Sequence, residues 1–449
     1  MNPYICGTDA EIREQLNAIG ILSLDDLFHC IPQELKNAHF EDLPPAMGEY
    51  ELTREIKYIA GKNRVKDGAV CFMGGGAYEH FIPAVVPALA ERAEFVTSYT
   101  PYQPEASQGN LQVFFEFQSL ICRLMEMDVA NASMYDGATA LAEGVIMAAN
   151  VRKGRTRCLV AETVHPHWRD VLATYLKNLE LRLETLKSEG GVIAPESLEK
   201  ALDDATACVV VQSPNFFGCI EDMAALSQKT HEAGGYFIAT VDPISLGILA
   251  PPGQYGADVA VGEGQPLGLL PYFGGETLGI FTCKLEFLRK MPGRLVGLTK
   301  DTNGRKAFVL TLQTREQHIR REKATSNICT NHALNATRAA IYLSTLGPQG
   351  LKEVAETCMA NTHYVRSRIR EIKGYAIPHE VPCFKEFTVR VRRGNVENLI
   401  GNMAQRGLII GPSLGQFNPE WRDCFLISTT EVRAREEMDS LLCALKEEA

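Results

Sequence analysis

The sequence lacks long hydrophobic runs and has no excess of positive charge. No stretch of about 18 consecutive apolar residues occurs, so no membrane-spanning helix is predicted. Aspartate and glutamate total 55 against 45 lysines and arginines, and the net charge is −10. Nucleic acids and anionic membranes attract concentrated positive charge, so neither is expected as the main partner. The nearest basic cluster, Arg390-Val-Arg-Arg393, is typical of a solvated strand end.

Paired cysteines and a secretory signal are also missing. The 13 cysteines include no CxxC pair and their number is odd, which excludes a disulfide framework and suits a reducing compartment. The first residues contain no basic segment followed by an apolar one, so no secretory signal is expected. We therefore predict a cytoplasmic protein. Its length of 449 residues indicates two or three structural units.

The pattern of apolar residues divides the chain into three regions. Residues 1–60 predict a helical arm, in which Thr8-Asp-Ala-Glu11 forms a capping box before the first helix. Residues 61–330 alternate buried strands with helices. That alternation predicts a large α/β domain with a mainly parallel central sheet and helices on both faces. Residues 331–449 predict a smaller C-terminal α+β domain.

Two buried strands of the large domain end in polar turns. The strand from Tyr236 ends at Asp242, and the strand from Ala257 ends at Gly262-Glu-Gly-Gln265. Open α/β sheets bind ligands at the carboxyl ends of their strands. An acid and a lysine there would suit a pyridoxal-phosphate enzyme, in which the lysine forms a Schiff base and the acid pairs with the pyridinium nitrogen. The acid is present, but the second turn contains no lysine.

The other elements of such a site are equally incomplete. Small residues in Ser133-Met-Tyr-Asp-Gly-Ala-Thr139 lead into a helix whose N-terminus could bind a phosphate. Asp136 weakens this hypothesis, because it would cap the helix and repel an anion. Lys284 directly follows a later strand and is expected to be solvated. No cysteine or histidine spacing matches a zinc site, so no metal is predicted.

Four segments carry a resemblance to a known family. They are Tyr99-Thr-Pro-Tyr-Gln-Pro-Glu105 with Ser107-Gln-Gly109, Asn131-Ala-Ser-Met-Tyr-Asp-Gly-Ala-Thr139, Met291-Pro-Gly-Arg294, and the polar run from Gln313 to Cys329. Together, and in this order, they resemble the glycine cleavage system P-protein, glycine dehydrogenase (decarboxylating). The length is similar to that of subunit 1 of the two-subunit form. The resemblance implies a fold-type-I pyridoxal-phosphate architecture, like that of aspartate aminotransferase.

The resemblance also implies partners and a cofactor. A homologous subunit 2 would bear the Schiff-base lysine and the pyridoxal phosphate. Gln265 stands about where that lysine would be, and a neutral amide cannot form an imine. This chain is therefore not expected to bind the cofactor covalently or to be active alone. The complex is implied to decarboxylate glycine and to pass the aminomethyl group to the lipoyl arm of H-protein.

The resemblance implies three groups of site residues. The loop from Tyr99 to Gln108 is similar to the segment that reaches the partner's active site, with these residues expected to shape it: Tyr99, Thr100, Tyr102, Gln103 and Glu105. A vestigial cofactor site would comprise Asp136, Asp242 and Gln265. Residues of the polar run would line an interface or a channel: Arg315, His318, Arg320 and Arg321.

Two other hypotheses remain open from the sequence. The chain could be a non-catalytic scaffold or regulatory subunit whose ancestral site is only vestigial. It could also be a self-sufficient pyridoxal-phosphate enzyme that uses another lysine, with Lys284 and Lys290 as the candidates.

Overall fold

The computed structural model describes residues 7–36, 43–63, 68–152, 154–271 and 275–449. The chain divides into two compact units, residues 1–64 and 65–449. The larger unit contains the central sheet and both main hydrophobic cores. In the described part of the chain, no helix combines the length and the apolar character needed to cross a membrane.

The first unit is helical in the residues that the structure describes. Its elements are α1 (Asp9–Ile19), η1 (Leu24–Phe28), α2 (Gln33–Lys36) and α3 (Glu49–Ala60). The capping box at Thr8 is confirmed, because its hydroxyl accepts from the Glu11 N–H and the Glu11 carboxylate accepts from the Thr8 N–H. None of the residues in these four elements is buried.

The second unit is built on a seven-stranded sheet with the order β2-β8-β7-β6-β5-β3-β4. Its strands are β2 (Val129–Ala130), β3 (Arg157–Ala161), β4 (Arg182–Leu186), β5 (Thr206–Ser213), β6 (Tyr236–Val241), β7 (Val259–Glu263) and β8 (Gly279–Cys283). Strands β4, β3, β5, β6 and β7 are parallel to one another. At one edge β8 pairs antiparallel with β7, and β2 pairs antiparallel with β8. The predicted, mainly parallel α/β sheet is confirmed.

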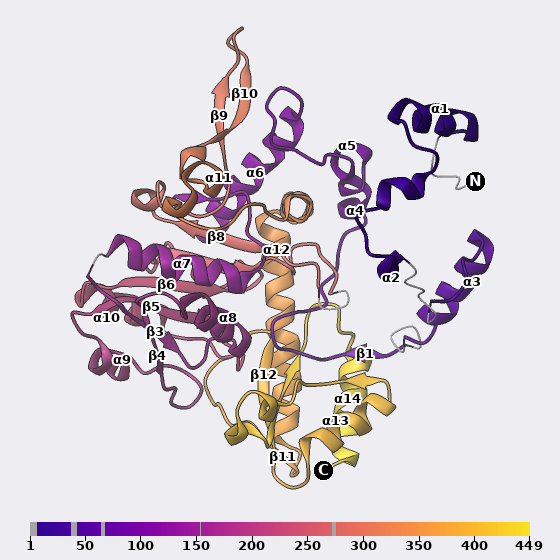
Figure 1. The fold of residues 1–449 in the computed structure, drawn as a ribbon. Coiled ribbons are helices and arrows are strands. Elements are labelled where there is room, and N and C mark those ends of the chain that lie inside the picture. The colour runs from indigo at the N-terminus through magenta and orange to yellow at the C-terminus, as the bar shows by residue number, and fades with distance from the viewer. Residues whose placement is uncertain (1–6, 37–42, 64–67, 153, 272–274) are drawn as a thin grey trace. The chain divides into compact units, whose positions relative to one another are not determined.

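Helices cover both faces of this sheet (Figure 1). They are α7 (Gly137–Val151), α8 (Pro166–Leu176), α9 (Pro195–Ala201) and α10 (Met223–Glu232). The connection from β3 through α8 to β4 runs in one direction across the sheet, and that from β5 through α10 to β6 runs in the other. Right-handed crossovers therefore place α8 and α10 on opposite faces. Helix α7 packs against α8 and against β7 and β8.

A smaller sheet with the order β11-β12-β14 lies in the C-terminal region. Its strands are β11 (Tyr375–Ala376), β12 (Glu386–Val391) and β14 (Cys424–Ser428), and its helices are α13 (Val396–Gln405) and α14 (Arg435–Glu447). Strand β1 (Val70–Cys71) pairs with β13 (Leu408–Ile409), so a segment that precedes the large sheet joins this region. These elements enclose a second hydrophobic core.

Helix α12 (Ala333–Arg370) runs along both cores. It contains a break at Gly347, where φ is 61°. Helix α14 begins at Arg435, and the residues just before it form a loop whose side chains bind other segments, as those of Thr430 and Glu431 do.

The remaining elements are α4 (Val85–Ala90), α5 (Ala93–Val96), α6 (Gln108–Met125), α11 (Gln317–Arg320), and the hairpin of β9 (Leu295–Lys300) and β10 (Lys306–Thr311). Helix α6 packs against α12 and against both strands of the hairpin. The hairpin, which the sequence did not predict, projects from the rest of its unit (Figure 1). Short 3-10 turns complete the chain: η3 (Ser245–Gly247), η4 (Leu285–Phe287), η5 (Gln313–Arg315), η6 (Arg321–Lys323), η7 (Leu414–Gln416) and η8 (Pro419–Trp421).

Candidate functional site

A small cavity lies at the carboxyl ends of β5, β6 and β7. Its volume is about 40 Å³. Residues 240–243 and Glu263 contribute from the sheet, and His165 and Trp168 contribute from the start of α8. The opposite wall consists of Tyr78 and residues 384–386, which precede and begin β12. The cavity therefore occupies the place where an α/β sheet presents its chemistry.

Asp242, the acid predicted at the end of β6, is paired with a lysine of the smaller sheet. The Nζ of Lys385 lies 2.6 Å from Oδ2 of Asp242, and the side chains of the lysine and the aspartate are only 2% and 15% exposed. The other oxygen of Asp242 accepts from the Ile244 N–H at 3.0 Å. The ammonium of Lys385 also lies 3.8 Å from the centre of the Tyr78 ring. The acid is therefore already neutralised by a residue of the same chain.

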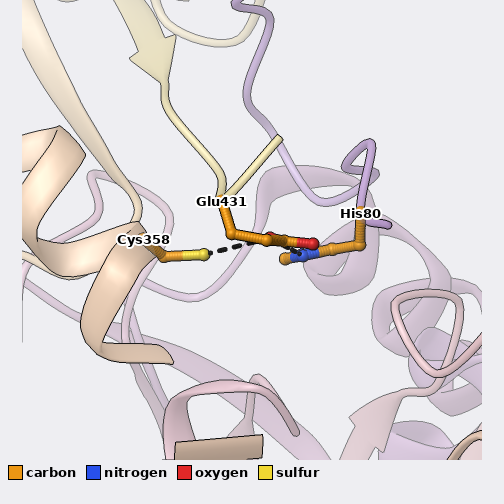
Figure 2. Close-up of side chains that lie close together, drawn as sticks. All are labelled: His80, Cys358 and Glu431. Atoms are coloured by element: carbon orange, nitrogen blue, oxygen red, sulfur yellow. Dashed lines mark hydrogen bonds and ion pairs between the residues drawn. The ribbon is translucent and has the colours of Figure 1, made fainter. Parts of the chain in front are cut away.

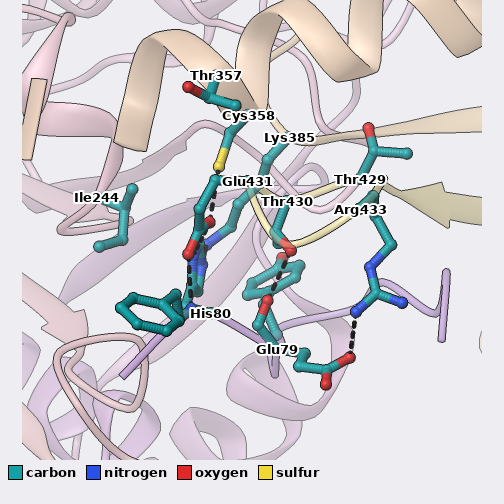
Figure 3. Close-up of polar contacts among 12 residues, drawn as sticks. Glu79, His80, Ile244, Thr357, Cys358, Lys385, Thr429, Thr430, Glu431 and Arg433 are labelled. Carbon is teal, nitrogen blue, oxygen red and sulfur yellow. Dashed lines mark hydrogen bonds and ion pairs between the residues drawn. The ribbon is translucent and has the colours of Figure 1, made fainter. Parts of the chain in front are cut away.

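Lys385 begins a buried chain of hydrogen bonds, drawn in Figure 3. Its Nζ donates to Nε2 of His80 at 3.0 Å. Because an ammonium can only donate, Nε2 accepts and the proton of His80 is on Nδ1, which donates to Glu431 at 2.7 Å. Burial, and then the charge of Lys385, lower the pKa of His80. Burial alone would raise the pKa of Glu431, but the hydrogen bonds from His80 and Phe81 bring it below its ordinary value.

Three members of this cluster have the chemistry of metal ligands. One ligand atom each of His80, Cys358 and Glu431 lies within 4.8 Å of the others (Figure 2). A metal on Nδ1 of His80 would force the imidazole proton onto Nε2, directly against the ammonium of Lys385 at 3.0 Å. The thiol of Cys358 instead donates to Glu431 at 3.4 Å, and burial raises its pKa well above the ordinary value. We assign hydrogen bonding and no metal to this cluster.

Gln265 is buried and its amide is fully used. Its Oε1 accepts from the Tyr78 N–H at 3.0 Å, and its Nε2 donates to the carbonyls of Tyr78 at 3.1 Å and Leu269 at 2.6 Å. The side chain thus bridges two backbone segments instead of facing a ligand. The two alternative lysines are elsewhere: Lys284 pairs with Asp258 at 2.6 Å, and Lys290 is exposed. Neither lines the cavity at Asp242.

The N-terminus of α7 is occupied by two carboxylates. Asp136 is the N-cap, as predicted, and its Oδ1 accepts from the Thr139 N–H at 2.7 Å. Glu263 accepts from the Gly137 N–H at 3.0 Å, from the Gln265 N–H at 2.9 Å and from the Leu278 N–H at 2.8 Å. Burial raises the pKa of Glu263 to about 7, against the lowering effect of these three hydrogen bonds.

His165 is another buried ring beside the cavity. Its Nε2 donates to the Gly75 carbonyl at 2.8 Å, and its Nδ1 accepts from the His167 N–H at 3.2 Å. Its ring lies edge-on to Phe216, with the ring centres 4.9 Å apart. Burial lowers the pKa of His165 to about 4, so the ring is neutral near pH 7. Both nitrogens are engaged with the backbone of the same chain.

The tyrosine loop is anchored at one residue and exposed at the others. The hydroxyl of Tyr102 donates to Asn331, and the Arg294 guanidinium lies 4.0 Å from the centre of its ring. Tyr99 is 96% exposed, and Thr100 is also exposed. Gln103 and Glu105 are exposed as well. The loop does not reach this chain's own cavity, and its role toward a partner stays a prediction.

The residues predicted for an interface or channel separate into two groups. Arg315 is buried, and its guanidinium donates to the carbonyls of Met291, Gly293 at 2.9 Å and Leu312 at 3.1 Å. It therefore braces neighbouring loops within the chain. The other three lie exposed on the short helices α11 and η6 and their role stays a prediction: His318, Arg320 and Arg321.

Sequence reasoning missed His80, which contacts Lys385, and several residues that line the cavity, notably Tyr78, Glu263, Lys385 and Glu386. A signal existed for the last two, because charged residues inside an otherwise apolar strand indicate buried partners. Glu386 accepts from the Tyr78 hydroxyl at 2.6 Å, and burial raises its pKa to about 7. No local pattern indicates that Glu263 reaches α7, since Glu263 and Gly137, the first residue of that helix, are more than a hundred residues apart in sequence.

The family model of the glycine cleavage system P-protein matches residues 2–445. The chain belongs to this family. A relative from Chlorobium phaeobacteroides, named probable glycine dehydrogenase (decarboxylating) subunit 1, is 49% identical over 443 residues, 98% of each chain. One of the same name from Thermomicrobium roseum is 48% identical over 438 residues, 96% of each chain.

Solved structures agree with membership of the P-protein family. A glycine decarboxylase (P-protein) in inhibitor-bound form matches with a TM-score of 0.90 and 43% identity, covering 99% of both chains. A sphingosine-1-phosphate lyase of Burkholderia pseudomallei has a TM-score of 0.68 at 14% identity, covering 93% of this chain and 94% of the other. The second likeness concerns the fold alone. The predicted fold-type-I pyridoxal-phosphate architecture is confirmed.

The residues of this P-protein chain do not fit the cofactor of that fold. Binding sites for small molecules usually measure about 300–1,000 Å³, whereas the cavity at Asp242 measures about 40 Å³. Asp242 is paired with Lys385, the N-terminus of α7 holds Glu263, and the amide of Gln265 is bonded to the backbone and cannot form a Schiff base. We therefore derive no chemical step through a cofactor in this chain.

Proposed function

We propose that this chain is subunit 1 of a glycine dehydrogenase (decarboxylating), and that its partner is a homologous, lysine-bearing subunit 2. The complex decarboxylates glycine with pyridoxal phosphate held by subunit 2, and transfers the aminomethyl group to the lipoyl arm of H-protein. The relatives named subunit 1, which match over almost the whole chain, support this proposal.

The observation that carries the division of labour is Gln265. Its amide makes three hydrogen bonds to the backbone. Among the described residues that line the cavity, the only lysine is Lys385, and it is held in an ion pair with Asp242. An amide cannot form a Schiff base. The chemistry of the complex therefore requires a second polypeptide, and the proposal places both subunits in the cytoplasm.

The tyrosine loop supports a contribution to the partner's active site. Asn331 and Arg294 hold Tyr102 in place, so the loop has a defined base. Tyr99 and its neighbours face outward, away from the chain's own cavity. A loop that is anchored yet presents polar and aromatic side chains to the outside suits a wall of a neighbouring site. In our proposal the exposed residues of this wall are Tyr99, Thr100, Gln103 and Glu105.

Reconstitution tests the proposal. This chain, subunit 2 and their mixture are assayed for glycine-dependent CO₂ release with lipoylated H-protein. We expect activity only from the mixture. Full activity from this chain alone, or activity of subunit 2 that is unchanged when this chain is added, would contradict the proposal.

A scaffold without influence on the active site is the second candidate, favoured by the filled cavity. Variants of the exposed loop separate the two candidates. Tyr99→Phe and Glu105→Gln should lower the turnover of the mixture, with unchanged association of the subunits by sedimentation. The matched control is Tyr58→Phe, an exposed tyrosine of α3. Unchanged turnover in both loop variants would favour the scaffold.

A further inference from the structure

The N-terminus of α7 has the properties of an anion site, but the anion is part of the chain. The helix is 15 residues long, and free N–H groups at the start of a helix attract negative charge. Here one oxygen of Glu263 accepts from the Gly137 N–H at 3.0 Å. Its other oxygen accepts from the Gln265 and Leu278 N–H groups at 2.9 and 2.8 Å. Three backbone donors from three segments thus converge on one carboxylate.

The packing leaves no space for a side chain at the glycines beside this carboxylate. A Cβ atom at Gly137 would lie 2.2 Å from the Trp168 ring and 3.0 Å from the Glu263 nitrogen. Gly264 is equally confined, because a Cβ there would lie 2.8 Å from Leu278. The glycines of this turn therefore bring the backbone of β7 close to α7. They place Glu263 where it reaches the first turn of the helix.

A cation of the chain occupies the other end of the cavity. Lys385 lies 2.6 Å from Asp242, the acid that would otherwise pair with a protonated pyridine nitrogen. Its ammonium also contacts the Tyr78 ring and Nε2 of His80. The remaining cavity of about 40 Å³ has room for only a few water molecules.

We propose that Glu263 and Lys385 are built-in replacements for the two charged ends of a phosphorylated pyridine cofactor. The carboxyl of Glu263 accepts the N–H group at the N-terminus of α7, and the ammonium of Lys385 pairs with Asp242. The cofactor site of the fold is thereby closed by the chain itself and serves as a structural core. This inference goes beyond the proposed function, because it concerns this chain in isolation and holds whatever reaction the complex performs.

The first test removes the built-in anion. Glu263→Ala leaves three backbone donors without an acceptor, so its unfolding temperature should fall. Inorganic phosphate should then raise that temperature more than an equal ionic strength of chloride does, whereas the wild type should show no phosphate-specific rise. The matched control is Glu221→Ala, which removes a buried glutamate that accepts from the Ile193 N–H and two side chains but does not lie at α7. Phosphate should not rescue this control.

Two results of this test would overturn the inference. One is a Glu263→Ala variant as stable as the wild type. The other is a destabilised variant that phosphate does not rescue, or rescues no better than it rescues Glu221→Ala. Should Glu263→Ala fail to fold, Glu263→Ser leaves a small polar side chain and still vacates the place of the carboxyl. Phosphate should then stabilise this variant more than chloride does, and no effect would overturn the inference.

The second test restores the lysine through the substitution Gln265→Lys. The amine that this substitution introduces could condense with the aldehyde of pyridoxal phosphate, with loss of water, and borohydride would reduce the imine to a stable secondary amine. Peptide mapping after reduction should find no pyridoxyl group at position 265 in the single variant. It should find one in E263A/Q265K/K385A, in which both built-in charges are gone. Folding of each variant is verified by its thermal transition.

Each outcome of the second test also supports or overturns the inference. A pyridoxyl group in the Q265K variant alone, or at Lys385 in the wild type, would show that the site is open and would overturn the inference. A folded triple variant without the group would show that other residues close the site, and would overturn it too. If the triple variant does not fold, the phosphate titration decides. Because all of these measurements use this chain alone, their failure is distinct from a failure of the proposed function.

Discussion

Replacement of Lys385 by methionine should strongly destabilise the larger unit. Met has a similar length and no charge, so the change removes the ammonium with little loss of packing. The side chains of Lys385 and Asp242 are 2% and 15% exposed and their charged atoms are 2.6 Å apart. The variant leaves Asp242 charged, partly buried and without its partner. Breaking such a buried pair typically costs about 3–5 kcal/mol.

The contacts of the ammonium with its neutral neighbours increase the loss. Nζ donates to His80 at 3.0 Å and lies 3.8 Å from the centre of the Tyr78 ring. A desolvated cation over an aromatic ring contributes about 2 kcal/mol. The losses of the ion pair, the hydrogen bond and the cation–ring contact do not simply add, because all three involve Nζ of Lys385. We therefore expect a decrease of about 3–5 kcal/mol in the free energy of unfolding, with the upper half of this range favoured.

Asp242→Asn in the same chain tests the origin of this loss. The amide keeps the acceptor for the Ile244 N–H and removes the charge. The double variant should be more stable than the sum of the single losses predicts, with a coupling energy of about 1.5 kcal/mol or more. The free energies of unfolding are measured by urea denaturation. The transition of the larger unit is fitted separately, because a chain of this size need not unfold in one step.

An exposed ion pair is the control for this cycle. Lys187 pairs with Glu162 at 2.8 Å, but the lysine is 76% exposed. Lys187→Met should therefore cost no more than about 1 kcal/mol. A loss for Lys385→Met as small as that of the control would refute the reasoning. The absence of a coupling energy between Lys385→Met and Asp242→Asn would also refute the reasoning, because the buried ion pair would then contribute nothing to stability.

Three further predictions concern single residues. Gln265→Leu should destabilise the chain by about 1–3 kcal/mol in urea titrations, because the buried Tyr78 N–H loses its acceptor; a neutral result would contradict the bridging role of the amide. His165 has a pKa lowered to about 4 by burial, so its contribution to stability is complete above pH 6.5 and is lost as the pH falls toward 4, by at most about 3 kcal/mol. His165→Gln should flatten this part of the stability profile, and an unchanged profile would refute the assignment. Tyr102→Phe, which removes the hydroxyl that donates to Asn331, should lower turnover of the reconstituted complex while costing only about 1 kcal/mol of stability; unaltered turnover would argue against an anchoring role.

The local order of elements was predictable because it depends on patterns of neighbouring residues. The capping box at Thr8 and the apolar run of the strand that ends at Asp242 both depend on residues within a few positions of one another. Periodicity also identified the βα alternation and hence the parallel sheet. The hairpin of β9 and β10 escaped, because its strands are mostly half-exposed and carry no clear alternation.

The absence of the Schiff-base lysine was evident in the sequence by itself. Gln265 lies two residues after the end of β7, and its chemical type excludes an imine whatever surrounds it. Asp136 as a helix cap was equally readable, since capping is local. The resemblance to the P-protein family extended these observations to a partner and a reaction. The matches over residues 2–445 confirm the family.

Only the tertiary structure decided what fills the site. Lys385 meets Asp242 across 143 positions of sequence, Tyr78 meets Gln265 across 187, and Glu263 meets Gly137 across 126. Such pairings depend on how the two sheets and their connecting loops pack, and no local pattern encodes them. The sequence therefore determined that a lysine is missing. The packing decided that the place is closed, because charges of the chain satisfy the acid and the helix end that a cofactor would otherwise require.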